Sequence, residues 1–161
     1  MEGIKKLLFI TACVFLGITF ISKLPAINIG NPAAEVYAEK WLNADSFSLK
    51  DNKDKVVVLE FWATWCGPCR TSIPHLKALS DKYKDKVVFV SLTNEPVSKD
   101  IESFCKQNNM TWVIGLGSNS GMDYKVRSIP RAFIVKDDKI IWSGHPMNPE
   151  FEKKLEPLAY R

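Results

Sequence analysis

Two cysteines, Cys66 and Cys69, are separated by a Gly-Pro pair and closely follow an apolar stretch rich in β-branched residues. Two thiols at this spacing, at the start of a helix, can close a disulfide without large backbone movement. The first sulfur then lies at the helix N-terminus, where unpaired N–H groups and the helix dipole stabilise an anion and lower the thiol pKa. We therefore predict that Cys66 attacks a substrate disulfide and that Cys69 resolves the mixed disulfide.

Glu60 precedes Cys66 by six residues and lies near the end of the predicted buried strand. A carboxyl group buried at that position would have a raised pKa, because low polarity disfavours its charged form. It could then accept the proton of Cys69 when that thiol attacks. We predict that Glu60 is the general base for the resolving thiol. The alternative is a half-exposed glutamate held in a salt bridge.

The elements that must position these residues alternate between strand-like and helix-like segments. Apolar β-branched runs predict strands, and apolar residues at helical spacing predict helices. The predicted strands cover residues 55–62, 87–92, 132–136 and 139–143, with short strands at 47–49 and 112–114. The predicted helices cover residues 67–83, 97–108 and 149–158, with short helices within 33–42 and near 121–127.

This order predicts one α/β domain. Asp137 and Asp138 indicate a hairpin turn between the last two long strands. The sheet is therefore expected to be mixed, with parallel strands joined by helices, then an antiparallel hairpin, and helices on both faces. The length of 161 residues, with 46% hydrophobic and 25% charged, is that of a single globular domain.

The stretch Phe-Trp-Ala-Thr-Trp-Cys-Gly-Pro-Cys at residues 61–69 resembles the active-site segment of the thioredoxin superfamily. Pro74 matches the proline that kinks the active-site helix of that family, and Ile129-Pro130 matches its cis-proline loop. The likeness covers roughly residues 45–160. It implies a thioredoxin fold, a three-layer α/β/α arrangement around a mixed central sheet, with a redox disulfide between Cys66 and Cys69.

The same resemblance indicates how substrate is bound. A cis bond before Pro130 would expose the backbone of Ile129 for pairing with a substrate peptide. Trp65 is expected to be an exposed apolar contact, whereas Trp62 and Cys105 are expected in the core. The implied substrate-binding residues are Trp65, Gly67, Pro68, Ile129 and Pro130.

The segment between Cys69 and Pro130 is longer than in plain thioredoxin. With the N-terminal extension, this insertion resembles the TlpA/ResA-like branch, whose members reduce disulfides in exported proteins, including apocytochrome c in some cases. Two positions depart from that branch: Ser72 replaces a common Glu, and Glu60 replaces a common Asn. Glu60 instead matches the buried acid of thioredoxin itself.

The N-terminus has the pattern of an export signal. Lys5 and Lys6 precede an apolar run over residues 7–21, which is shorter than the about 20 residues that span a bilayer. We expect a signal peptide or signal anchor at 1–22, a linker at 23–42 and the thioredoxin-like domain at 43–161. The domain is then exported to a periplasmic or other extracytoplasmic space, either released or anchored by residues 7–21.

Charge and composition bear on the expected partners. The net charge of +4 comes from basic residues scattered among acidic ones, so we expect no nucleic-acid binding. The sequence has no nucleotide or flavin signature, and we expect no bound cofactor. The expected partners are disulfide-containing client proteins and a membrane thiol donor that returns electrons to the exported cysteine pair.

Cysteine pairs also occur in metal sites, peroxidases and metal-delivery proteins. A structural zinc site needs two further ligands, and the only histidines, His75 and His145, stand alone, so we expect no metal site. A peroxiredoxin-like peroxidase would not need Cys69 so close to Cys66. A copper-delivery protein would separate its cysteines by three residues and add a distant histidine. Both remain alternatives to disulfide reduction.

Overall fold

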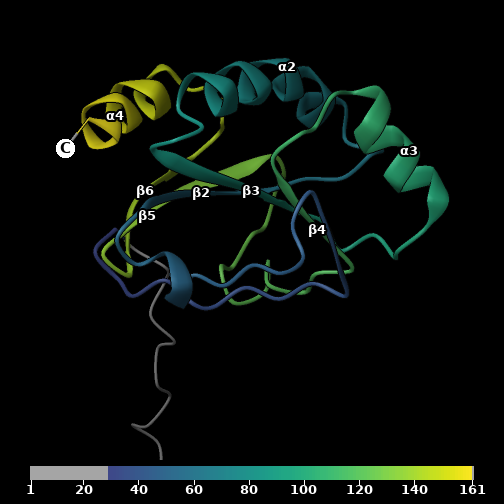
Figure 1. Cartoon of the computed structure of the whole chain (residues 1–161), viewed down its shortest axis with the longest axis horizontal. Helices are drawn as coiled ribbons and strands as arrows, with labels where there is room; N and C mark the ends of the chain where they lie inside the picture. The colour runs from purple at the N-terminus through teal and green to yellow at the C-terminus, as the bar shows by residue number, and fades with distance from the viewer. Residues whose placement is uncertain (1–28, 161) are drawn as a thin grey trace, which may run out of the picture.

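The computed structural model describes residues 29–160, which fold around a six-stranded mixed sheet (Figure 1). The strands are β1 (Lys40–Leu42), β2 (Val56–Phe61), β3 (Val87–Leu92), β4 (Val113–Leu116), β5 (Arg131–Lys136) and β6 (Lys139–Gly144). Their order in the sheet is β1-β4-β3-β2-β5-β6. Strand β2 is central, parallel to β3 and antiparallel to β5, and is buried along its whole length. Its apolar run over residues 56–59 reflects burial on both faces.

The three α-helices lie close to the predicted helices 67–83, 97–108 and 149–158, whereas the short 3₁₀ helix was not predicted. The helices are the 3₁₀ helix η1 (Lys50–Asn52) and the α-helices α2 (Gly67–Lys82), α3 (Lys99–Gln107) and α4 (Pro149–Ala159). Ser98 and Asn148 cap α3 and α4 by accepting backbone N–H groups through their side chains. Asp137 and Asp138 both adopt positive φ in the β5–β6 hairpin, as its predicted two-residue turn requires.

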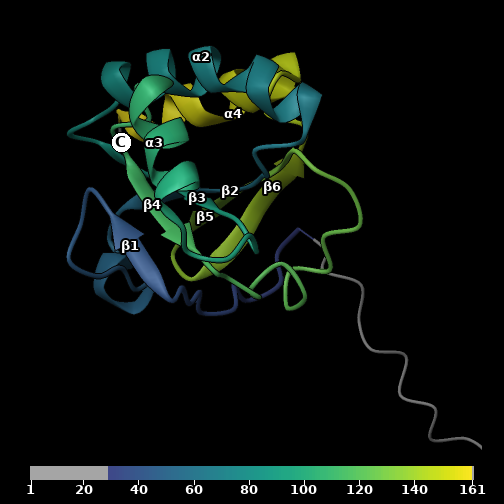
Figure 2. The same cartoon turned by 90° about the vertical axis from the view of Figure 1, so that its right-hand side faces the viewer.

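All three α-helices pack on one face of the sheet (Figures 1 and 2). Their buried contributions to the shared core are Ile73, Leu76 and Leu79 from α2, Ile101 and Cys105 from α3, and Phe151, Leu155 and Ala159 from α4. Val58 and Trp62 meet them from β2 and the turn that follows it. The predicted core positions of Trp62 and Cys105 are confirmed, since both side chains are buried.

The opposite face differs from the expected second helical layer. It is covered by η1 and irregular segments, which bury Val36, Leu49 and Tyr124 against the sheet. The predicted helix within 33–42 is wrong, because this chain is extended and its N–H groups bond elsewhere. Tyr37 N–H donates to Ser120 Oγ at 2.9 Å and Glu39 N–H to the Leu116 carbonyl at 2.9 Å.

Two other short elements were also predicted incorrectly. Residues 47–49 form no strand, because the Leu49 N–H donates to the Glu35 carboxylate at 2.7 Å and β1 occupies the sheet edge instead. The segment near 121–127 makes turns, with backbone bonds from Lys125 N–H to Met122 O at 3.0 Å and from Val126 N–H to Gly121 O at 2.9 Å. Lys125 has φ of 48° in this segment, a left-handed conformation that does not continue a helix.

Residues 30–42, which we call the N-terminal strap, pass under the sheet from one edge to the other. Gly30 N–H donates to Ile140 O on β6 at 2.7 Å, and β1 at the far end of the strap pairs with β4. Val36, between these ends, is 1% exposed. Strap and sheet approach closely at Gly115, where a Cβ would lie 2.9 Å from Ala38 Cβ. The described part of the predicted linker is thus packed on the domain.

The predicted export segment, residues 1–22, lies outside the described residues. Between residues 29 and 160, no helix combines the length and apolar character that crossing a membrane requires.

Candidate active site

The cysteine pair lies where β2 turns into α2. Cys66 is the N-cap of α2, and its Sγ accepts a hydrogen bond from the Cys69 N–H at 3.2 Å. The two residues form a disulfide, with their Cα atoms 5.2 Å apart. Pro68 lies in the first turn, where a missing N–H costs no helical hydrogen bond. The predicted placement of the first sulfur at the N-terminus of a helix is therefore confirmed.

Exposure distinguishes the two sulfurs. Cys69 is fully buried, whereas Cys66 is 5% exposed and is flanked by the exposed residues Trp65 and Gly67. Trp65 is 73% exposed, as predicted, and offers a large apolar surface beside the disulfide. Cys66 is therefore the more accessible of the two cysteines.

Glu60 lies on the same face of β2 as Val58 and Trp62, which face the helices and the cysteines. It is 3% exposed and makes no ion pair with any residue of the described chain, so the salt-bridge alternative is wrong. Burial raises the pKa of Glu60 to about 8, against a smaller opposing effect of a hydrogen bond from Ser91. The predicted rise in pKa is confirmed, and its main cause is desolvation.

The predicted cis bond between Ile129 and Pro130 is present. Pro130 is buried and Ile129 half-buried, directly before β5, the neighbour of β2 in the sheet. Ile129 and Trp65 lie on the lining of one cavity of about 570 Å³. The structure thus brings the cis-proline loop and the cysteine turn to the same cavity.

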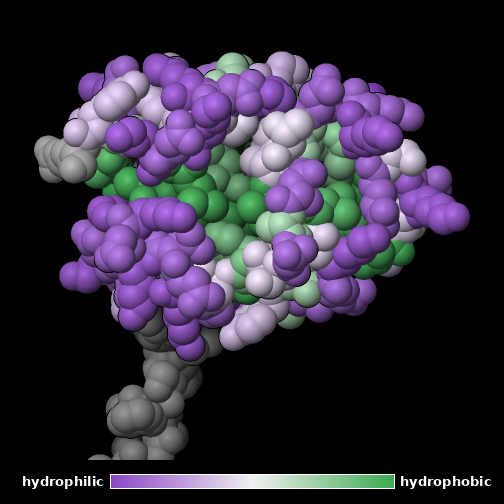
Figure 3. Space-filling view, viewed as in Figure 1, coloured by the Kyte–Doolittle hydropathy of each residue, from purple (hydrophilic) through white to green (hydrophobic). Residues whose placement is uncertain are grey.

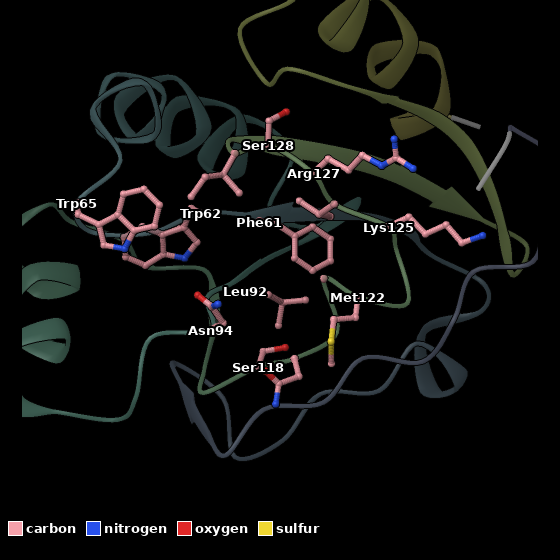
Figure 4. Close-up of a pocket in the computed structure, with 14 residues that line it drawn as sticks. Phe61, Trp62, Trp65, Leu92, Asn94, Ser118, Met122, Lys125, Arg127 and Ser128 are labelled. Atoms are coloured by element: carbon pink, nitrogen blue, oxygen red, sulfur yellow. The ribbon is translucent and has the colours of Figure 1, made fainter. Parts of the chain in front are cut away.

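This cavity, which we call the client pocket, has an apolar floor and a basic rim (Figure 4). Phe61 and Leu92 lie at its centre, and Met122, which is 75% exposed, lies on the side away from Trp65. Lys125 and Arg127 also line it. The combination of an apolar floor and basic residues suits an apolar side chain of an extended peptide.

On the opposite face of the molecule, apolar side chains are visible in a band between the helices and the segments below the sheet (Figure 3).

Sequence reasoning missed Glu95, which holds the turn before the cysteines. Its carboxylate accepts the backbone N–H and the hydroxyl of Thr64, each at 2.6 Å. Thr93 Oγ also donates to it at 3.2 Å. A signal was available, because Thr64 and Glu95 follow the parallel neighbours β2 and β3, whose carboxyl ends meet at one edge of the sheet.

The remaining cysteine of the described chain, Cys105, is buried, and burial followed by the charges of Glu95 and Glu102 raises its pKa to about 12. It is therefore a poor nucleophile near neutral pH. Among residues 29–160, no three His, Cys, Asp or Glu side chains gather in an arrangement that could hold a metal ion.

The fold and the disulfide at the N-terminus of α2 together define a thioredoxin-fold thiol–disulfide oxidoreductase. Solved structures share the fold. The thioredoxin domain of a thiol-disulfide oxidoreductase from Bacteroides vulgatus superposes with a TM-score of 0.69 at 19% identity, covering 81% of this chain and 98% of that one. A thiol:disulfide interchange protein from Bacteroides sp. gives a TM-score of 0.68 at 21% identity, covering 82% and 93%.

Residues 22–156 match the Redoxin family, and the chain belongs to it. It is 34% identical over 145 residues to the thioredoxin-like protein YneN of Bacillus subtilis, covering 86% of this chain and 85% of YneN. It is 32% identical over 146 residues to the thiol-disulfide oxidoreductase ResA of Bacillus cereus, covering 87% and 84%. The expected resemblance to the TlpA/ResA-like branch is confirmed by these relatives.

Proposed function

We propose that this protein reduces disulfides of exported client proteins, with Cys66 as the nucleophile and Cys69 as the resolving thiol. The observation that carries the proposal is the position of Cys66 Sγ, which caps α2 and accepts the Cys69 N–H while Cys69 itself is fully buried. A helix N-terminus favours the thiolate, which is the attacking species.

The reaction begins from the reduced protein. The Cys66 thiolate attacks one sulfur of the client disulfide, forming a mixed disulfide and releasing one client thiolate. Cys69 then loses its proton and attacks Cys66 Sγ, which breaks the mixed disulfide and releases the second client thiolate. Two electrons pass to the client, and the Cys66–Cys69 disulfide seen in the structure is the product.

Glu60 is the proposed acceptor of the Cys69 proton. It lies on the face of β2 that is turned toward α2, the helix that carries Cys69, and burial raises its pKa to about 8, close to that of an ordinary thiol. A base whose pKa lies near that of its partner exchanges a proton readily in both directions. The same group could therefore return the proton when the disulfide is reduced again.

The client is proposed to bind across the cis-proline loop and the client pocket. The backbone of Ile129 would pair with an extended client segment, and Trp65 would cover the side chain next to the reacting cysteine. Gly67 and Pro68 are exposed at the helix start and complete the contact surface. Pro130, which is buried, would hold the loop in place.

The location and the electron donor are part of the proposal. The basic and apolar N-terminal sequence supports export, with residues 7–21 as a signal or anchor. An exported reductase must be reduced again, and a membrane thiol protein is the proposed source of electrons. The resemblance to the TlpA/ResA-like branch supports clients with vicinal cysteines, apocytochrome c among them.

Trapping tests the proposal. In a Cys69→Ala variant expressed with its N-terminal segment, the mixed disulfide cannot be resolved, and clients should accumulate covalently on Cys66. Cys66→Ala is the negative control, and Cys105→Ala should behave as the parent chain because that thiol is buried. Capture of exported cysteine-containing proteins supports the function. Absence of any mixed disulfide, with rapid turnover of hydrogen peroxide or tight copper binding instead, would favour the alternative functions.

A further inference from the structure

Ser91 lies beside Glu60 in the parallel register of β2 and β3. It is 1% exposed, and its Oγ accepts a hydrogen bond from the indole Nε1–H of Trp112 at 2.9 Å. Trp112 is itself buried and directly precedes β4, the strand on the other side of β3. The three side chains therefore form a line across the sheet, from β4 through β3 to β2.

The donor and acceptor groups of these side chains determine which way the hydrogen bonds along this line point. An indole N–H can only donate, so Trp112 occupies a lone pair of Ser91 Oγ and leaves the hydroxyl hydrogen free to point elsewhere. The Ser91 hydroxyl is hydrogen-bonded to Glu60, and this bond favours the ionised carboxylate. A donor that is itself polarised by a second donor binds an anion more strongly.

We propose that Ser91 and Trp112 are positioning residues, a hydrogen-bond relay that stabilises the ionised form of Glu60 and so prepares it to take the proton of Cys69. The proposal rests on the function given above for Glu60. Without the relay, the buried carboxyl would stay protonated to higher pH, and a smaller fraction of it would be ionised and able to accept a proton near neutrality.

The side chain of Asn43 fixes the backbone segment that carries Trp112. The side-chain amide of Asn43, directly after β1, donates to the Trp112 carbonyl at 2.7 Å and to the Met110 carbonyl at 2.8 Å. These two bonds secure the segment that carries the indole. Trp112 therefore has a defined orientation toward Ser91.

Few other polar or titratable groups lie in the part of the core where they could change the pKa of Glu60. On the helix side, the titratable groups of this core are the cysteine pair at the start of α2, Tyr83 directly after α2 and Cys105 of α3, while α4 presents apolar side chains. The partner of Glu60 on β5 is Ala132. The buried members of this core include no Lys, Arg or His. Among the polar neighbours of Glu60, Ser91 is thus the one whose removal should change the pKa of Glu60 most.

Infrared titration of the oxidised protein tests the relay, because the disulfide-bonded cysteines do not titrate and the Glu60 band is assigned by its loss in Glu60→Gln. Ser91→Ala should raise the pKa of Glu60 by about one unit or more, the value of a hydrogen bond to a charged group. Ser91→Thr, which keeps the hydroxyl, should leave it unchanged. Trp112→Phe should raise it by less.

A double variant tests whether Ser91 and Trp112 act in series. If the two residues act in series, Ser91→Ala combined with Trp112→Phe should shift the Glu60 titration no further than Ser91→Ala alone. Additive shifts, or no shift in Trp112→Phe, would overturn the relay. Trp41→Phe, on the other face of the sheet, is the matched control. If Ser91→Ala does not fold, Trp112→Phe and Ser91→Thr still decide the question.

The relay and the proposed function can fail separately. A Glu60→Gln variant that resolves mixed disulfides as fast as the parent chain would remove Glu60 from the reaction, whatever the infrared titrations show. Unchanged infrared titrations in both relay variants, with slow resolution in Glu60→Gln, would keep the base and reject the relay.

Discussion

The carboxylate of Glu95 binds Thr64 through two hydrogen bonds, from the backbone N–H to one oxygen and from the hydroxyl to the other, each at 2.6 Å. Thr64 lies two residues before Cys66, so this pair joins the turn that carries the nucleophile to the end of β3. The backbone carbonyl of Glu95 also accepts Gly117 N–H at 3.0 Å, which extends the connection to the segment after β4.

Replacing Glu95 by Gln should disturb this turn. The Thr64 hydroxyl can turn to accept from the new NH₂ group, but both hydrogen bonds lose their charged partner, so we expect a loss of about 1 kcal/mol in the free energy of unfolding. Disulfide-reduction kcat/KM should fall about tenfold, because reaction geometry is sensitive to small displacements. Urea unfolding and turnover of a protein disulfide measure the two effects. Glu102→Gln, which breaks only a partly exposed ion pair with Lys40, should change both little.

Glu60 should make the oxidised protein less stable as the pH rises. Between its ordinary pKa of 4.5 and about 8, the unfolded chain has lost this proton while the folded chain keeps it. Unfolding then releases a proton, and stability falls by about 1.4 kcal/mol per pH unit within this window. In Glu60→Gln, the free energy of unfolding, measured by urea titration at pH values from 5 to 8, should depend less steeply on pH. An equally steep slope in that variant would contradict the assignment.

Glu35 should act in the opposite sense. Partial burial disfavours its charge, but hydrogen bonds from Leu49, Val36 and Lys50 N–H and from the Ser48 hydroxyl outweigh this and lower its pKa. Its contribution to stability is therefore present above its ordinary pKa of 4.5 and is lost as the pH falls through the lowered value. Glu35→Gln should cost about 1–2 kcal/mol at pH 7.

The cost of Glu35→Gln should shrink at low pH, where the parent chain also loses the charge. Thermal unfolding at pH 7 and pH 3 checks this. Glu39→Gln, an exposed residue of the same strap, serves as the control and should cost little at either pH. A cost that does not change with pH would show that Glu35 acts through packing rather than charge.

The client pocket should bind protein disulfides more than small ones. Met122→Ala removes an exposed apolar side chain from its lining, and KM for a protein disulfide should rise about tenfold, which corresponds to about 1.4 kcal/mol. A small-molecule disulfide that does not fill the cavity should show a smaller rise. Met147→Ala, also an exposed methionine but outside the pocket, is the matched control. Equal effects of the two substitutions would contradict the pocket.

Local patterns in the sequence were sufficient to predict the central elements and the cysteine site. The apolar run of β2, the Gly-Pro pair between the cysteines and the proline before β5 each act through adjacent residues. Glu60 could be predicted because alternation along β2 places it on the cysteine face. Its raised pKa then followed from burial.

The parts that could not be predicted depend on partners far away in the chain. The strap has helix-forming residues, yet Tyr37 bonds Ser120 and the Tyr124 hydroxyl donates to Ala34 O at 2.6 Å, contacts that no local pattern encodes. Glu95 and the pairing of Ser91 with Trp112 depend on which strands become neighbours. Tertiary hydrogen bonding there outweighed intrinsic propensity.

The strap has a consequence for self-association. Strand edges with unpaired backbone groups invite pairing with another chain. In this sheet, residues 30–32 pair with β6, and residues 40–42 form the edge strand β1 beside β4. Cleavage of the chain between these two segments, followed by release of residues 30–32, would leave β6 with unpaired backbone groups that a strand of another molecule could bond.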